Sequence, residues 1–184
     1  MKAMILAAGY GKRMMPLTEN LPKPLLKIGN KSLIERNINA LLAAGFSDII
    51  INVSYLGSMI KKHVLEIFPN ANISFSEEEI PLGTGGGVLN AIRLLGKDPF
   101  LLINADIYHQ INLKDLEQDV DIAHLVGVEN PDHNADGDFS LNSNVVSIKN
   151  NLNECTWSGI SIINPKIFDG LKIEDAPFDI WKSI

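Results

Sequence analysis

The chain has 184 residues, a mass of 20.2 kDa and 46% hydrophobic side chains, which is enough to fill one core and excludes a predominantly disordered chain. Its net charge of -6 and its pI near 5.2 argue against binding to nucleic acid or to a membrane surface. Residues 1–31 nevertheless carry six basic side chains and one acidic side chain, so an anionic ligand is expected at the N-terminal end.

Apolar runs and helical spacings alternate along the first 104 residues. Short runs that are apolar on both faces predict buried strands at 2–6, 49–53, 73–76 and 100–103. Apolar residues at helical spacing predict three helices, between Ser32 and Gly45, at 56–68 and at 85–95. The first of these has a capping box, because Glu35 stands three residues after Ser32. This alternation predicts an α/β fold of three layers with a mostly parallel sheet, whose ligand lies beyond the carboxyl ends of the strands.

The pattern becomes looser after residue 106. A strand is expected at 122–128, a polar loop at 129–138, short strands at 145–148 and 157–163, and a helix from near Asp179. There is no internal repeat, low-complexity tract or linker in the sequence. Residues 1–184 are therefore expected to form a single domain.

Cysteine and histidine usage limits the classes of site. The single cysteine, Cys155, cannot form an intramolecular disulfide, which favours a reduced, cytoplasmic protein. The four histidines show no metal-ligand spacing, so no structural metal is expected. No apolar run reaches the ~20 residues that a membrane span needs.

The first strand leads into Leu-Ala-Ala-Gly-Tyr-Gly-Lys-Arg at residues 6–13. Residues this small let backbone N–H groups approach a phosphate or a base, and two cations follow at once, so this loop is predicted to hold an anion. It is not a dinucleotide-binding fingerprint, because Met14 occupies the position of the third glycine. The alternative is a simple glycine turn with solvated Lys12 and Arg13.

Two further loops could hold phosphates or a nucleoside. Lys23 stands between Pro22 and Pro24, which stiffen the chain on both sides of the ammonium group, although the side chain could be merely exposed. The glycine-rich residues 83–87 precede a helix, which suggests that something approaches this backbone closely. The alternative there is a flexible turn between strand and helix.

Polar side chains follow the last apolar strand of the first half. Asn104 and Asp106 come directly after it, so Asp106 is expected at the ligand-binding edge of the sheet, where a carboxylate facing phosphates would hold Mg²⁺. Asp106 could instead cap the next segment. Asp138, next to Gly137, could accept hydrogen bonds from sugar hydroxyls or serve only as a turn residue.

Taken together, these motifs resemble the sugar-phosphate nucleotidyltransferase family. The resemblance rests on the pattern Leu-Ala-Ala-Gly-x-Gly-x-Arg-Met-x-Pro-Leu-Thr at 6–18, followed by Pro-Lys-Pro-Leu at 22–25. The later motifs at 83–87, 104–106, 137–139 and 157–161 most resemble the members that transfer uridylyl groups to N-acetylmuramate 1-phosphate in cell-wall (peptidoglycan) recycling. The similarity extends from Met1 to about Phe178.

The resemblance implies a Rossmann-like nucleotide-diphospho-sugar transferase fold and a Mg²⁺-dependent reaction. A sugar 1-phosphate would attack the α-phosphate of UTP, with Arg13, Lys23 and Asp106 as catalytic residues and Asp106 as the metal ligand. Asn104 and Asp138 would bind the sugar. Nucleotide-binding residues by the same resemblance are Leu6, Ala8, Gly9, Gly11, Lys12, Arg13, Lys23, Thr84 and Gly85.

The sequence departs from the family pattern in three places. Met15 stands where arginine is frequent, and Ala105 stands where glycine is common. The family's C-terminal segment, with a Trp-x-Asp-Val-Gly-Thr-like motif and a second Mg²⁺ ligand, is expected to be missing. The alternatives are therefore a mannose-1-phosphate guanylyltransferase, another sugar-1-phosphate nucleotidyltransferase, or a truncated nucleotide-binding protein without catalysis. The protein is expected to be a monomer or a weak homo-oligomer.

Overall fold

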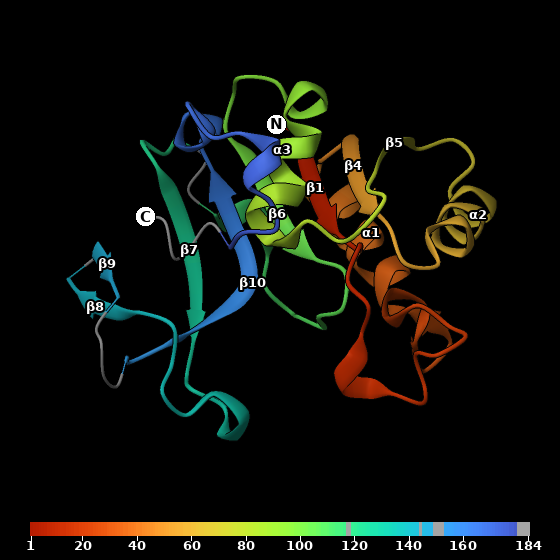
Figure 1. Cartoon of the computed structure of the whole chain (residues 1–184), viewed down its shortest axis with the longest axis horizontal. Coiled ribbons are helices and arrows are strands. Elements are labelled where there is room, and N and C mark those ends of the chain that lie inside the picture. Colours follow the sequence, from red (N-terminus) through yellow and green to blue (C-terminus); the bar gives the residue numbers. More distant parts are fainter. Residues whose placement is uncertain (117–118, 144, 149–152, 180–184) are drawn as a thin grey trace.

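A six-stranded sheet with the order β5-β4-β1-β6-β10-β7 forms the centre of the molecule (Figure 1). The computed structural model describes residues 1–116, 119–143, 145–148 and 153–179. The strands are β1 (Ala3–Leu6), β4 (Asp48–Val53), β5 (Asn72–Glu77), β6 (Phe100–Asn104), β7 (Ala123–Val128) and β10 (Thr156–Ile163). Neighbouring pairs among β5, β4, β1 and β6 are parallel, whereas β10 is antiparallel to both β6 and β7. The expected mostly parallel sheet is confirmed.

Helices cover both faces of this sheet. They are α1 (Leu33–Ala44), α2 (Gly57–Ile67) and α3 (Gly83–Leu95). Ile5 and Ile51 belong to the same core cluster as apolar residues of α1 and α2, whereas Met4 and Ile50, which point to the opposite face, cluster with residues of α3. The three expected layers are therefore present.

The first helix begins and ends where the sequence predicts. The side chain of Ser32 accepts a hydrogen bond from the Glu35 N–H, and the Glu35 carboxylate accepts one from the Ser32 N–H. Gly45 ends the helix with a positive φ of 94°. The predicted capping box is confirmed.

Helix α3 begins at Gly83, two residues earlier than predicted, and its glycines are covered by other parts of the chain. A Cβ atom on Gly83 would lie 2.7 Å from the Phe178 carbonyl oxygen, and one on Gly86 would lie 2.9 Å from the Ala176 Cβ atom. A Cβ atom on Gly87 would lie 2.7 Å from the Asn52 amide nitrogen. The close approach that the glycine run predicted is thus made, at these three positions, by protein atoms.

Short elements complete the described chain. Two small antiparallel pairs are formed by β2 (Lys27–Ile28) with β3 (Lys31–Ser32) and by β8 (Ser140–Asn142) with β9 (Val145–Ser147). Single turns of 3-10 helix lie at Lys12–Met14, Lys23–Leu25, Leu113–Asp115, Asp132–Asn134, Pro165–Phe168 and Ile173–Asp175. The sequence predicts β9 but not its partner β8. The helix expected from near Asp179 falls on 180–184, outside the described residues.

The carboxyl ends of β1, β4, β5 and β6 lie at one edge of the sheet, which is the lower edge in Figure 1. The loop that follows β1 is at this edge, and β10 begins there because it runs in the opposite direction (Figure 1). Among the described residues, no helix is long and apolar enough to cross a membrane.

Candidate active site

A cavity of about 470 Å³ opens at the carboxyl edge of the sheet. Its lining comes from the carboxyl ends of β1, β4 and β6, from the segments that follow β1, β5 and β6, and from the Lys23 turn: residues 6–14, Lys23, Pro24, Asn52, Glu78, Pro81, Gly83, Thr84, Asn104 and Asp106. Of the residues predicted to bind nucleotide or catalyse the reaction, all but Gly85 line this cavity. The fold therefore brings together loops that are up to 100 residues apart in the sequence.

The conformation of the glycine loop depends on Gly11 and Thr18. Gly11 has a positive φ of 64°, and a Cβ atom there would lie 3.1 Å from Thr18 Cγ2 and 3.3 Å from Lys23 Cβ. The buried Thr18 hydroxyl donates a hydrogen bond of 2.8 Å to the Gly11 carbonyl oxygen. This packing holds the loop against Lys23, so the two predicted phosphate-binding segments form one structural unit.

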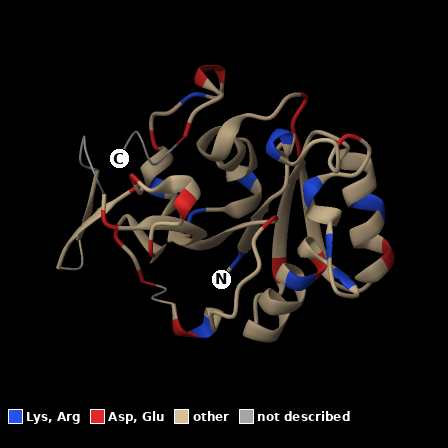
Figure 2. Ribbon diagram, turned by 90° about the horizontal axis from the view of Figure 1, so that it is seen from below, with Lys and Arg blue, Asp and Glu red and all other residues tan. Residues whose placement is uncertain are grey.

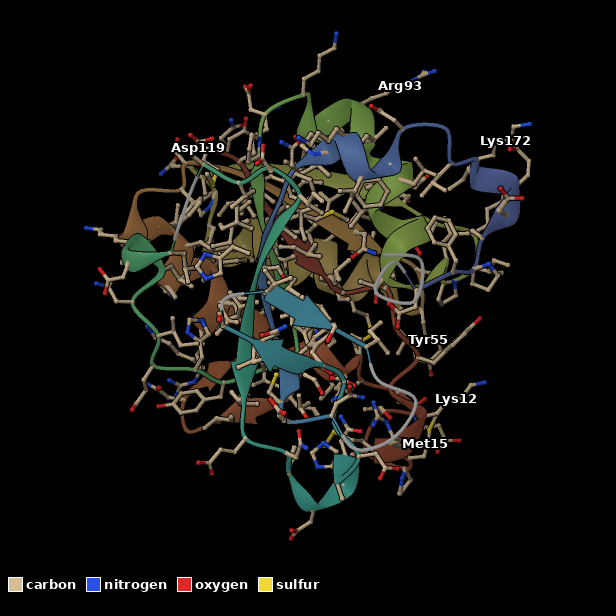
Figure 3. All side chains as sticks on the ribbon, turned by 90° about the vertical axis from the view of Figure 1, so that its left-hand side faces the viewer. Lys12, Met15, Tyr55, Arg93, Asp119 and Lys172 are labelled. Atoms are coloured by element: carbon tan, nitrogen blue, oxygen red, sulfur yellow. The ribbon has the colours of Figure 1, made fainter. Side chains whose placement is uncertain are left out.

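Aromatic side chains support the outer side of this loop. The rings of Tyr10 and Tyr55 lie 5.5 Å apart, and the Lys12 ammonium lies 5.1 Å from the centre of the Tyr10 ring. Figure 3 shows Lys12 and Tyr55 on the same side of the molecule. Within the described ranges, neither Lys12 nor Arg13 forms an ion pair with a carboxylate. Both cations are exposed and available to an anion.

Lys23 and Asp106 form an ion pair in the wall of the cavity. Both side chains are partly buried, with 25% and 32% of their surfaces exposed. Pro24 and Leu25 are buried in the turn that carries Lys23, so the turn is anchored in the core while the ammonium group points into the cavity. A carboxylate and an ammonium in contact at the edge of a phosphate-sized cavity can exchange partners when a phosphate enters.

The end of β6 is held in place from behind by Asn37 of α1. Its side-chain amide donates to the carbonyl oxygens of Asn104, Ala105 and Ile107, at 3.4, 3.3 and 3.2 Å. These contacts surround Asp106 on both sides in the chain. Asn37 is buried, so the hydrogen bonds fix the backbone from which the Asp106 carboxylate projects.

Asn52 and Glu78 also line the cavity, and the sequence reasoning missed both. Asn52 accepts a hydrogen bond of 2.7 Å from the Ala7 N–H and donates one of 2.6 Å to the Glu78 carboxylate. The other oxygen of Glu78 accepts a bond of 2.9 Å from the Leu82 N–H. Burial raises the pKa of the Glu78 carboxyl group, and the hydrogen bonds from Leu82 and Asn52 oppose this shift. The network ties the glycine loop to the start of α3.

Replacing Asn52 by alanine should lower the free energy of unfolding by about 2–4 kcal/mol at neutral pH, because the Ala7 N–H and the Glu78 carboxylate both lose a buried partner. The ionised carboxylate then costs more in the folded state, so the pKa of Glu78 rises further. The deficit should shrink as the pH falls from about 7 to about 5, because Glu78 takes up a proton.

Urea titrations of the parent and the Asn52→Ala variant at both pH values measure this difference. Asn72→Ala is a matched control, because Asn72 is exposed on the neighbouring strand β5, and it should change stability by less than about 0.5 kcal/mol. A deficit that grows on acidification would contradict the assignment of the effect to Glu78.

Two predicted site residues lie outside the cavity lining. Gly85 is buried in the first turn of α3, where its N–H donates to the Phe178 carbonyl oxygen. Asp138 accepts hydrogen bonds from the Trp157 N–H, at 2.9 Å, and from the Asn134 side chain, at 3.1 Å. Asp138 thus holds the start of β10, which lies at the same edge of the sheet as the cavity.

The donor set at this edge is compatible with one Mg²⁺ ion shared with phosphates. In the part of the chain that the structure describes, no group of three or more His, Cys, Asp or Glu residues could hold a metal ion by itself. Mg²⁺ is commonly bound by one or two carboxylates together with water and phosphate oxygens of the substrate. Asp106 supplies such a carboxylate, whereas both oxygens of Glu78 are already engaged within the protein.

Charge is distributed unevenly around the cavity. Figure 2 views the molecule from below, where most of the Lys and Arg positions lie in the half with the N-terminal loop and Asp and Glu predominate in the half with β7 to β10. Lys12, Arg13 and Lys23 contribute to this difference at the cavity itself. An anionic ligand would be drawn to the side of the cavity formed by the glycine loop.

The family model described as Nucleotidyl transferase matches residues 2–126 of this chain. An N-acetylmuramate alpha-1-phosphate uridylyltransferase from Neisseria meningitidis serogroup B is 43% identical, over 94% of this chain and 79% of that protein. A mannose-1-phosphate guanyltransferase from Schizosaccharomyces pombe is 34% identical over the whole of this chain. The chain spans 54% of the length of that fungal protein.

Solved structures show the same arrangement of the chain. HddC from Yersinia pseudotuberculosis, in a complex with GMP-PN, superposes with a TM-score of 0.76 and 30% identity, over 96% of this chain and 80% of that one. This likeness confirms the expected Rossmann-like nucleotide-diphospho-sugar transferase fold.

Proposed function

Since the chain belongs to the nucleotidyl transferase family, we propose that it transfers a uridylyl group from UTP to a sugar 1-phosphate, releasing pyrophosphate. The favoured acceptor is N-acetylmuramate 1-phosphate, as in cell-wall recycling in the cytoplasm. The observation that carries the proposal is the Lys23–Asp106 ion pair, which lies in the same cavity as the glycine loop and its exposed cations Lys12 and Arg13. The 43% identity over most of both chains supports the choice of uridylyl group and acceptor.

The proposed reaction is a single displacement at phosphorus. An oxygen of the sugar phosphate forms a bond to the α-phosphorus of UTP, while the bond from that phosphorus to the bridging oxygen of the β-phosphate breaks. The bridging oxygen leaves with its electron pair as part of pyrophosphate. Little covalent chemistry is required of the protein, so positioning and charge neutralisation supply most of the rate enhancement.

The cations of the cavity have distinct roles in this proposal. Arg13 stabilises the charge that develops on the departing pyrophosphate, because it follows the loop on which the triphosphate rests. Lys23, which packs beside this loop, contacts the α-phosphate and the sugar phosphate. Its ammonium group exchanges the Asp106 carboxylate for phosphate oxygens as the substrates enter, which keeps it neutralised in both states.

Asp106 then becomes available as a ligand for Mg²⁺. When bound, the ion would be held by Asp106 and by phosphate oxygens of the substrates, and it would neutralise charge on those oxygens. The backbone around Asp106 is held by Asn37, so the carboxylate is positioned before the substrates arrive. Asn104, two residues before Asp106, contacts the sugar in this proposal. Asp138, which holds the start of β10 at the same edge of the sheet, contacts the sugar as well.

Guanylyl transfer from GTP to mannose 1-phosphate is the second candidate. The fungal guanyltransferase matches the entire chain at 34% identity, which supports this candidate.

Pyrophosphate release distinguishes these candidates. The chain is assayed with UTP, GTP, CTP and dTTP, each paired with N-acetylmuramate 1-phosphate, mannose 1-phosphate and glucose 1-phosphate, at saturating Mg²⁺. The highest kcat/KM is expected for UTP with N-acetylmuramate 1-phosphate. Preference for GTP with mannose 1-phosphate would replace the first candidate by the second, and nucleotide binding without turnover would indicate a non-catalytic binding protein.

A further inference from the structure

A second cavity, of about 250 Å³, is lined in part by the segment that follows Asp106. Its walls include Lys31 of β3, Arg36 in the first turn of α1, and Tyr108 and His109 from the chain after β6. The residues that line it include no aspartate or glutamate. None of its lining residues belongs to the proposed active site.

Arg36 is held in a fixed position at this cavity. Its Nε and Nη2 atoms donate to the Ile28 carbonyl oxygen, and its guanidinium group lies 5.6 Å from the centre of the Tyr108 ring. Neither hydrogen bond to Ile28 uses the N–H groups of Nη1. An arginine that is already ordered loses little side-chain entropy when it binds a phosphate.

The positive charge of this cavity comes from Lys31 and Arg36. Neither side chain is paired with a carboxylate among the residues whose placement is described. Burial lowers the pKa of His109, against a smaller opposing effect of the Ile111 backbone, so its ring adds hydrogen-bonding capacity rather than charge at neutral pH. Two cations without a compensating acid favour a ligand with two negative charges, such as a phosphate monoester.

We propose that this second cavity binds a small phosphorylated molecule, and that its occupancy changes the rate of the reaction at Asp106. The phosphate group would lie between Lys31 and Arg36, and the organic part would lie on the ring of Tyr108, which is about half exposed. The cavity volume suits a molecule of the size of a sugar phosphate rather than a complete nucleotide.

The route from this cavity to the active site is short. Tyr108 and His109 follow Asp106 by two and three residues, so a ligand that contacts them bears directly on the same segment. Asn37, which also lines the second cavity, is the residue that holds the carbonyl groups on both sides of Asp106. A shift of about 1 Å in the Asp106 carboxylate would be enough to change turnover.

Binding can be tested without any turnover by ¹H–¹⁵N NMR spectra of the full chain. The probes are inorganic phosphate and glucose 6-phosphate, whose phosphate group is not on the anomeric carbon and which therefore cannot act as acceptor in the proposed reaction. Saturable shifts of the Arg36, Tyr108 and His109 amides are expected with both probes. The amides of residues 9–13 report separately on the active site.

Matched variants assign the shifts to the second cavity. Lys31→Met and Arg36→Met should each weaken binding of the probes by about tenfold, the usual effect of losing one charge-assisted contact. Lys27→Met, a change at a nearby exposed position outside the cavity, should alter the affinity by less than about twofold. Lys23→Met should leave the shifts at Arg36, Tyr108 and His109 in place.

Shifts confined to residues 9–13, or unchanged affinity in Lys31→Met, would overturn the assignment of a second site. Lys31 is exposed, so its replacement does not threaten folding. The effect on rate is measured with the nucleotide that the chain uses. Glucose 6-phosphate should change kcat or the apparent KM of the parent about fivefold, and it should change neither in Lys31→Met. Binding without this change would refute the coupling to Asp106, and failure of uridylyl transfer would leave the NMR result standing.

Discussion

Replacing Asp106 by asparagine is expected to lower kcat by roughly 10³-fold, with little change in stability. The amide has the shape of the carboxylate but not its charge, so it should bind Mg²⁺ weakly and cannot neutralise Lys23 in the free protein. A loss of this size corresponds to about 4 kcal/mol of transition-state stabilisation. It is measured as pyrophosphate release at saturating substrates over a range of Mg²⁺ concentrations.

The Mg²⁺ dependence separates two roles of Asp106. If the carboxylate is a metal ligand, the variant should need more Mg²⁺ for half-maximal activity and should recover part of its rate at high Mg²⁺. Asp48→Asn is a suitable control, because Asp48 is a carboxylate paired with Lys2 at the opposite end of β4, and it should retain full activity. A lower rate with an unchanged Mg²⁺ requirement would show that Asp106 acts only by positioning Lys23.

Replacing Lys23 by methionine should lower kcat by about 10²-fold or more, with a smaller effect on KM. Methionine keeps the apolar stem that packs against Gly11 but removes the charge that faces the reacting phosphates. Because the ammonium group is already paired with Asp106 before substrate binds, its charge should contribute more in the transition state than in the ground state. Steady-state kinetics of the variant measure both parameters.

Two comparisons make this result specific. Lys23→Arg keeps the charge and should recover part of kcat, whereas Lys27→Met removes an exposed charge from the neighbouring β2 and should leave kcat within about twofold of the parent. An intact kcat with only a raised KM would mean that Lys23 contributes uniform binding and does not stabilise the transition state.

Most of the sheet could be predicted from the sequence, because its central strands are apolar on both faces and are separated by clear helical periods. Residues 49–53 and 100–103 fit this description, and both strands extend by no more than one residue beyond the predicted ends. The direction of β10 could not be predicted, because an apolar strand reads the same whether its neighbours are parallel or antiparallel. β8 was missed because it has one apolar residue between two polar ones, whereas its equally short partner β9 begins with two valines.

The cavity was predictable where a charge coincides with glycine or proline in one short segment, as in the Gly9–Arg13 loop and at Lys23 between two prolines. Asn52 and Glu78 were hidden by their neighbours, since Asn52 lies within an apolar strand and Glu78 lies within a run of three glutamates that suggests a solvated surface. One signal could have identified Asn52: a polar residue near the carboxyl end of a strand whose other positions are apolar on both faces. The partner of Asp138, the Trp157 backbone, could not be read from local sequence.

The position of β1 at the middle of the sheet has a consequence for the synthesis of this protein. β1 leaves the ribosome before both of its neighbours, β4 and β6, so both of its edges are covered only after residue 104 has been translated. Until then an apolar strand with open hydrogen-bonding edges is present in the nascent chain. Long-range parallel pairing of this kind slows folding and exposes intermediates to aggregation, so nascent chains that stall before β6 should be the species that chaperones must protect.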